Sequence, residues 1–240
     1  MSSHFQLNLG SVAASRVFGL KLRVLIQLVK DVDPDCYVEL GAHKLFTFRE
    51  VASVMSSKAS LVAVDLYEQA PAHESAPQDL PLSVSEAEKI LANLSQIQKR
   101  ILKADTRTLK PVDLGELQSS DRPFVFIDGG HSLETGVSDF KLVTSSLKLG
   151  SKATIVIDDL GLDGTDATVP VALEWVSRQF GGEILVSHNM RDQGKWLPPE
   201  QSIAVVSGCK TARDIMAKYE AKFQLLIVRC EKVTLKPKFL

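Results

Sequence analysis

The sequence lacks a strong excess of charge of either sign, a cysteine framework and a long hydrophobic run. Its 28 Lys and Arg residues nearly balance 29 Asp and Glu residues, giving a formal net charge of −1, which argues against broad binding to a nucleic-acid backbone. The three cysteines are widely spaced and no CxxC pair occurs, so disulfide frameworks and zinc cages are poor interpretations. No apolar stretch approaches the roughly 20 residues that a spanning helix needs, so we expect no membrane association.

The N-terminal segment 1–9 also lacks the basic region and apolar core of a signal peptide, and we therefore expect a cytoplasmic protein. A length of 240 residues suits one domain, and no Gly/Ser-rich linker divides it. We expect a helical lead over 1–34, a core over 35–207, and a helix and strand extension over 208–240.

Short apolar runs, several of them ending in an acidic residue, predict a set of buried strands. Their β-branched and aromatic content, and their apolar character at successive positions, are typical of strands buried on both faces of a parallel sheet. The predicted strands are 36–40, 61–65, 124–128 and 153–158, with a weaker one at 101–104 and three more at 184–188, 202–206 and 224–230.

Segments with helical spacing of apolar residues separate these strands. A Ser85-x-x-Glu88 capping box predicts the start of one of them. The predicted helices are 11–29, 85–100, 132–147, 166–180 and 211–222. Alternating strands and helices predict an α/β fold, a doubly wound, mostly parallel Rossmann-like sheet with helices on both faces.

Such sheets bind ligands beyond the carboxyl ends of their strands, and candidate ligand-binding residues fall there. Glu39 and Gly41 end the first strand, although the full G-x-G-x-x-G fingerprint of dinucleotide-binding proteins is absent. Asp65 ends the second strand, where a carboxylate can accept hydrogen bonds from ribose hydroxyls. Asp105 could accept from an adenine amino group, or it could serve as a helix cap.

Two further motifs contain the candidate catalytic and metal-binding residues. The two candidate catalytic residues, Asp128 and His131, lie in the segment FIDGGHS, where a glycine-rich turn follows a strand. His131 is a candidate general base or a structural residue of the turn. Asp158 and Asp159 close the next strand, and with Asp128 they could bind Mg²⁺ through hard oxygen ligands. Alternatively, one of these acids caps a helix and another faces solvent.

The order VELG, VDLYE, AD, FIDGGHS and IVIDD over residues 35–180 resembles the class I S-adenosylmethionine-dependent methyltransferases. The resemblance is strongest to the small-molecule group that includes macrocin-type sugar O-methyltransferases. It implies methyl transfer to a hydroxyl of a small-molecule acceptor such as a sugar or natural product, with Mg²⁺ assistance in the metal-using members. Relatives in this group often self-associate, so a homo-oligomer is expected by analogy.

The resemblance also implies roles for individual residues. Glu39 and Gly41 would line the methionine and ribose side of the cofactor, Asp65 would bind the ribose, and Asp105 would approach the adenine. Asp128, Asp158 and Asp159 would match the metal-binding acids, Asp128 would also border the cofactor, and His131 would match the base near the acceptor hydroxyl.

Two alternatives stay open. The unusual residues after Gly41 would also suit a non-catalytic binding protein on a decayed methyltransferase fold. A nicotinamide-dependent oxidoreductase fits Gly41 and Asp65 but not the missing glycines. The proline-containing stretch 68–84 is a surface insertion or a lid. The segment 189–201, which contains Trp196, is an exposed hairpin or a cover for the acceptor pocket.

Overall fold

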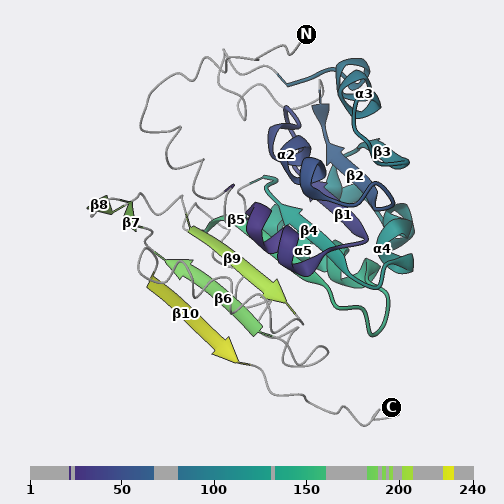
Figure 1. Cartoon of the computed structure of the whole chain (residues 1–240). Coiled ribbons are helices and arrows are strands. Elements are labelled where there is room, and N and C mark those ends of the chain that lie inside the picture. The colour runs from purple at the N-terminus through teal and green to yellow at the C-terminus, as the bar shows by residue number, and fades with distance from the viewer. Residues whose placement is uncertain are drawn as a thin grey trace.

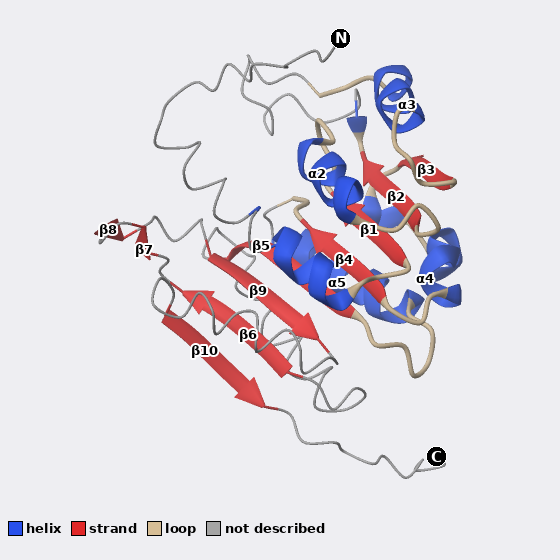
Figure 2. Cartoon of the chain, in the orientation of Figure 1, coloured by secondary structure: helices blue, strands red, loops and turns tan. Residues whose placement is uncertain are grey.

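The structure is a computed structural model of the chain. It describes residue 22 and residues 25–67, 81–130 and 133–160, together with five short strands between residues 183 and 229. For residues 133, 159 and 160 and for those later strands, the backbone alone is described. Figure 2 shows the described helices and strands in colour.

Among the described residues, eight strands form one sheet in the order β10-β6-β9-β5-β4-β1-β2-β3 (Figure 1). The five strands from β3 to β5 are parallel, whereas β9, β6 and β10 continue the sheet in antiparallel pairs. The strands are β1 Cys36–Leu40, β2 Ser60–Asp65, β3 Gln98–Lys103, β4 Pro123–Ile127, β5 Thr154–Leu160, β6 Glu183–His188, β9 Ser202–Ser207 and β10 Gln224–Arg229.

The predicted strands are confirmed, most of them to within one or two residues. The larger difference is at β3, which begins three residues earlier than expected. The first residues of β3, Gln98-Lys99-Arg100, carry no apolar signal because β3 is the edge strand of the parallel set. Two short strands, β7 Arg191–Asp192 and β8 Lys195–Trp196, pair separately as the hairpin within 189–201.

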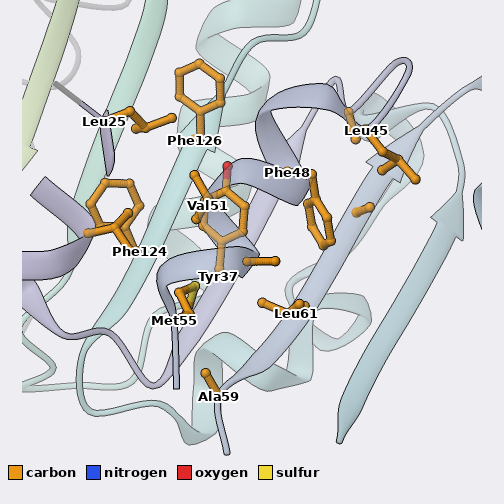
Figure 3. Close-up of a cluster of buried hydrophobic side chains, with 14 of the residues drawn as sticks. Leu25, Tyr37, Leu45, Phe48, Val51, Met55, Ala59, Leu61, Phe124 and Phe126 are labelled. Carbon is orange, nitrogen blue, oxygen red and sulfur yellow. The ribbon is translucent and has the colours of Figure 1, made fainter. Parts of the chain in front are cut away.

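The sheet is doubly wound, as predicted, because helices cover both faces of its parallel strands, whose alternate residues enter two different cores. On one face, Tyr37, Leu61, Phe124 and Phe126 pack with the helical segment 25–32, α2 Phe46–Val54 and α3 Val84–Ala92 (Figure 3). The opposite face carries Val38, Val62, Val125 and Ile155, packed with α4 Gly115–Ser119 and α5 Leu133–Ser146.

The predicted helix 85–100 is wrong in its second half and at its cap. Helix α3 ends at Ala92, and the capping box is Ser83 with Glu86, not Ser85 with Glu88. Ser83 Oγ accepts from the Glu86 N–H at 3.3 Å, and Glu86 Oε2 accepts from the Ser83 N–H at 2.9 Å. The predicted pair and the observed pair of residues both match the S-x-x-E motif. The helix that starts after Ser83 buries Ala87 and Leu91.

The helix predicted at 132–147 is confirmed as α5, whose Phe140 and Val143 are buried as expected. The predicted helices 166–180 and 211–222, most of 11–29 and most of the stretch 68–84 lie outside the described residues. None of the described helices has the length and apolar character needed to cross a membrane.

Candidate functional site

The candidate site lies where the strand order reverses between β1 and β4. Helices leave these two strands toward opposite faces of the sheet, so a crevice is expected beyond their carboxyl ends. The predicted residues Glu39, Gly41, Asp65, Asp128 and Asp158 all come to this edge, because the strands that carry them are neighbours in the parallel set.

Gly41 allows the ends of β1 and β4 to approach one another closely. It has a φ of +85°, and a β-carbon at this position would lie 2.1 Å from the Asp128 carbonyl oxygen and 2.7 Å from the Gly129 Cα. The Asp128 N–H also donates to the Leu40 carbonyl at 2.8 Å. A side chain at position 41 would therefore both strain the backbone and separate the two strand ends.

The residues after Gly41 fold down onto the end of β2. The N–H groups of Gly41 and Ala42 donate to the Val64 carbonyl at 2.9 and 3.2 Å. Leu45, the N-cap of α2, adopts a φ of +58°, and its side chain is fully buried in the same core cluster as Phe48 and Val51 (Figure 3). The bulky Leu45 side chain therefore packs into the protein interior.

Asp65 is half-buried at the end of β2, and its carboxylate binds two backbone amides. Oδ2 accepts from the His43 N–H at 2.7 Å and Oδ1 accepts from the Tyr67 N–H at 2.8 Å. His43 and Tyr67 both have positive φ values, 38° and 51°, a conformation that costs about 1–3 kcal/mol per residue. A carboxylate has about four acceptor sites, so each oxygen of Asp65 retains one for a ligand.

Glu39 lies next to the last residue of β1 and is only 2% exposed. Its Oε2 accepts a hydrogen bond from the Tyr37 hydroxyl at 2.5 Å. Burial raises the pKa of Glu39 to about 8; the Tyr37 hydrogen bond opposes this shift, while the charges of Asp65 and Asp158 add to it. Glu39 is therefore mostly uncharged at neutral pH, and its predicted contact with the cofactor stays a prediction.

The acids proposed for Mg²⁺ come together only in part. In the parallel pairing of β4 with β5, Ile127 is opposite Ile157, so Asp128 and Asp158 follow at the same level of the sheet. Asp128 is half-buried and Asp158 is buried. Within the part of the chain that the structure describes, no group of three or more His, Cys, Asp or Glu residues could hold a metal ion. The side chain of Asp159 lies outside that part.

Asp105 serves as a cap, which was one of its two interpretations. It precedes the short 3-10 helix η2 Thr106–Thr108, and its Oδ1 accepts from the Arg107 N–H at 3.0 Å. The Arg107 guanidinium binds both carboxylate oxygens, with the shortest distance 2.6 Å, and this hydrogen bonding lowers the pKa of Asp105. Its role toward an adenine stays a prediction.

One notable residue, Asp139 of α5, carries no sequence motif that predicts its position. It is 1% exposed, and neither of its carboxylate oxygens accepts a hydrogen bond from any described residue. Burial raises the pKa of Asp139 to about 6, and the nearby Thr106 hydroxyl offsets this only in part. The available signal was the spacing of Thr135 and Asp139, which places two polar residues on one side of α5 against the glycine turn.

The candidate base His131 lies outside the described residues, so its role stays a prediction. The turn that leads to it is shaped by α5. A β-carbon at position 129 would lie 2.8 Å from Asp139 Oδ2, and one at position 130 would lie 3.2 Å from Thr135 Cγ2. The two glycines therefore let the turn pack directly on the first turns of α5.

No protein-family model and no curated protein matches the sequence. Solved structures do match the fold. CalS11, a calicheamicin methyltransferase, superposes with a TM-score of 0.52 at 14% identity, over 81% of this chain and 79% of that chain. A putative O-methyltransferase from Klebsiella pneumoniae gives a TM-score of 0.52 at 13% identity, over 84% of this chain and 91% of that chain.

A putative caffeoyl-CoA O-methyltransferase from Staphylococcus aureus is similar to the same extent, with a TM-score of 0.50 at 14% identity, over 83% of this chain and 92% of that chain. At such identities the likeness concerns the fold. The five parallel strands in the order β3-β2-β1-β4-β5, with helices on both faces, agree with it. The chain has the class I methyltransferase fold.

Proposed function

We propose that the protein is an S-adenosylmethionine-dependent methyltransferase that acts on a hydroxyl of a small molecule such as a sugar or natural product. The observation that carries the proposal is the pairing of Gly41 with Asp65 at the switch point. Gly41 allows the backbone of β1 to turn against β4, and Asp65 presents a half-buried carboxylate one strand away.

The residues at this edge fit an adenosyl cofactor. Asp65 retains one acceptor site on each oxygen, which matches the two hydroxyls of a ribose. The Leu45 side chain is buried in the hydrophobic core, so its bulk does not count against a cofactor at this edge. When bound, the cofactor supplies a methyl group on a positively charged sulfonium.

The chain would contribute orientation and proton transfer. Asp65 would fix the ribose, and the Gly41 turn would keep the backbone close to the cofactor. Holding both reactants in line accounts for a large share of such a rate enhancement. His131 would accept the proton of the acceptor hydroxyl while the hydroxyl oxygen forms its bond to the methyl carbon and the carbon–sulfur bond breaks.

Magnesium assistance by Asp128, Asp158 and Asp159 is a separate prediction, to which the described residues add no complete ligand set. Turnover that is the same in excess EDTA as in added Mg²⁺ would contradict it. Turnover that needs the ion and is lost in Asp128→Ala would support it.

Calorimetric titration tests the proposed cofactor. Purified protein is titrated with S-adenosylmethionine, with S-adenosylhomocysteine and with NAD. We expect saturable binding of the first two, and at least tenfold weaker binding in Asp65→Ala, since two charge-assisted hydrogen bonds to the ribose are lost. Asp121→Ala is the matched control, because Asp121 is exposed near the opposite ends of the strands and pairs with Lys148.

The main alternative is a non-catalytic binding protein, and one observation favours it. Asp65 already binds the amides of His43 and Tyr67, which holds the loop after β1 against β2. A flat titration with all three ligands, from protein that unfolds cooperatively in urea, would refute the methyltransferase and favour this alternative. Binding of NAD alone would favour an oxidoreductase.

A further inference from the structure

Among the described residues, none makes a hydrogen bond of normal geometry to the buried carboxylate of Asp139, although a polar group in this position needs a partner. Both oxygens are inaccessible to solvent, and no described residue donates to them. An unpaired buried carboxylate is costly, and such groups are rare in native proteins. The lack of a donor among the described residues therefore requires a physical explanation.

The location of Asp139 identifies the region in which a partner would be found. The carboxylate lies against Gly129, in the turn that follows β4. Helix α5 also packs on η2, which follows β3. The hydroxyl of Thr106 in η2 lowers the pKa of the Asp139 carboxyl group. Asp139 thus lies between the loops at the ends of β3 and β4, beside the crevice of the proposed cofactor.

The acids around the crevice differ in their remaining capacity to accept hydrogen bonds. Both oxygens of Asp105 accept two hydrogen bonds each from Arg107, which fills the roughly four acceptor sites of a carboxylate. Asp65 retains one site on each oxygen. Among the described residues only the Thr106 hydroxyl lies close enough to affect Asp139, so its carboxylate keeps at least three of its roughly four acceptor sites.

We propose that Asp139, rather than Asp105, accepts the hydrogen bond from the exocyclic amino group of the adenine. This inference rests on the proposed function. With the ribose at the end of β2, the attached base would extend toward the neighbouring strand β3 and η2, and its amino group is the donor that a carboxylate there would recognise. Access requires that η2 move away from Asp139. This helix is a three-residue turn, and its Arg107 and Thr108 are exposed.

The test compares binding of S-adenosylhomocysteine with binding of S-inosylhomocysteine, which has a carbonyl oxygen in place of the amino group. The wild-type protein should bind the adenosine compound at least about tenfold more tightly, the value of one hydrogen bond to a charged group. Asp139→Asn keeps the shape of the side chain and should reduce this discrimination to about twofold or less, because an amide can donate to the carbonyl oxygen.

The pH dependence of wild-type binding is a second readout that needs no variant. The charged groups acting on Asp139 are Asp105 and Arg107 of η2, which stay ionised and paired between pH 5 and 7. Because the free carboxyl has a pKa of about 6 and the amino group binds the ionised form, affinity should fall as the pH drops below about 6. In Asp139→Asn this fall should be absent.

The outcomes separate the two proposals. Unchanged discrimination in Asp139→Asn, with discrimination lost in Asp105→Asn, would overturn the inference and leave the cofactor proposal intact. Equal wild-type binding of the two compounds would also overturn it. No wild-type binding of either compound would refute the proposed function and the inference together. Asp121→Asn, at the other end of the strands, is the control and should bind as the wild type does.

Discussion

Replacing Gly41 by alanine should destabilise the protein more than any other described Gly→Ala change. The new β-carbon would lie 2.1 Å from the Asp128 carbonyl oxygen, a backbone atom that cannot rotate away. A φ of +85° costs a residue with a β-carbon about 1–2 kcal/mol, and overpacking typically costs about 1–3 kcal/mol more. Gly41→Ala should therefore lower the free energy of unfolding by about 2–5 kcal/mol, a large share of a typical total.

Two other glycines separate these contributions. Gly150 has a φ of +83°, but a β-carbon added there would have no neighbouring atom within 4 Å, so Gly150→Ala should show the backbone cost alone. Gly115 has an ordinary helical φ of −57° and open space, so Gly115→Ala should be neutral or stabilising by up to about 1 kcal/mol. Urea unfolding followed by circular dichroism measures all three. If Gly41→Ala cost no more than Gly150→Ala, the close approach of β1 and β4 would be refuted.

Two further predictions concern a titrating side chain and a helix cap. Between about pH 6.5 and 8 the wild-type free energy of unfolding should fall by about 1–2 kcal/mol, because buried Glu39, with a pKa of about 8, holds a proton that the unfolded chain has already lost. Glu39→Gln should remove this slope in urea titrations at the two pH values, whereas Asp139 titrates mainly below this window. Ser83→Ala should cost about 1 kcal/mol, and Ser85→Ala should stay within about 0.5 kcal/mol. Equal effects in thermal melts would contradict the cap formed by Ser83 and Glu86.

The strands were predictable because their signal is local. A run such as Phe124-Val-Phe-Ile127 is apolar at every position because both faces of β4 are covered, and that property is visible without knowledge of the neighbours. The edge strand β3 and the start of α3 were less well predicted. The first residues of β3 carry no apolar pattern, and two overlapping S-x-x-E motifs span the start of α3.

In the candidate site, too, the positions of the residues were predictable from the sequence and their surroundings were not. Glu39, Gly41, Asp65, Asp128 and Asp158 could be assigned to one edge of the sheet from their places at strand ends, and the parallel pairing confirms that assignment. Their individual surroundings were not predictable. How many hydrogen bonds a carboxylate accepts depends on donor groups that come from other parts of the chain.

The sequence by itself determined the strand and helix pattern, the parallel α/β fold and the acids that meet at its carboxyl edge, because short-range periodicity encodes these features. Only the tertiary structure decided that the His43 and Tyr67 amides bind Asp65, that Gly41 faces the Asp128 carbonyl, and that Asp139 is buried without a partner among the described residues. The physical reason is that burial and hydrogen-bond partners arise from contacts between segments far apart in the chain, which no local pattern records.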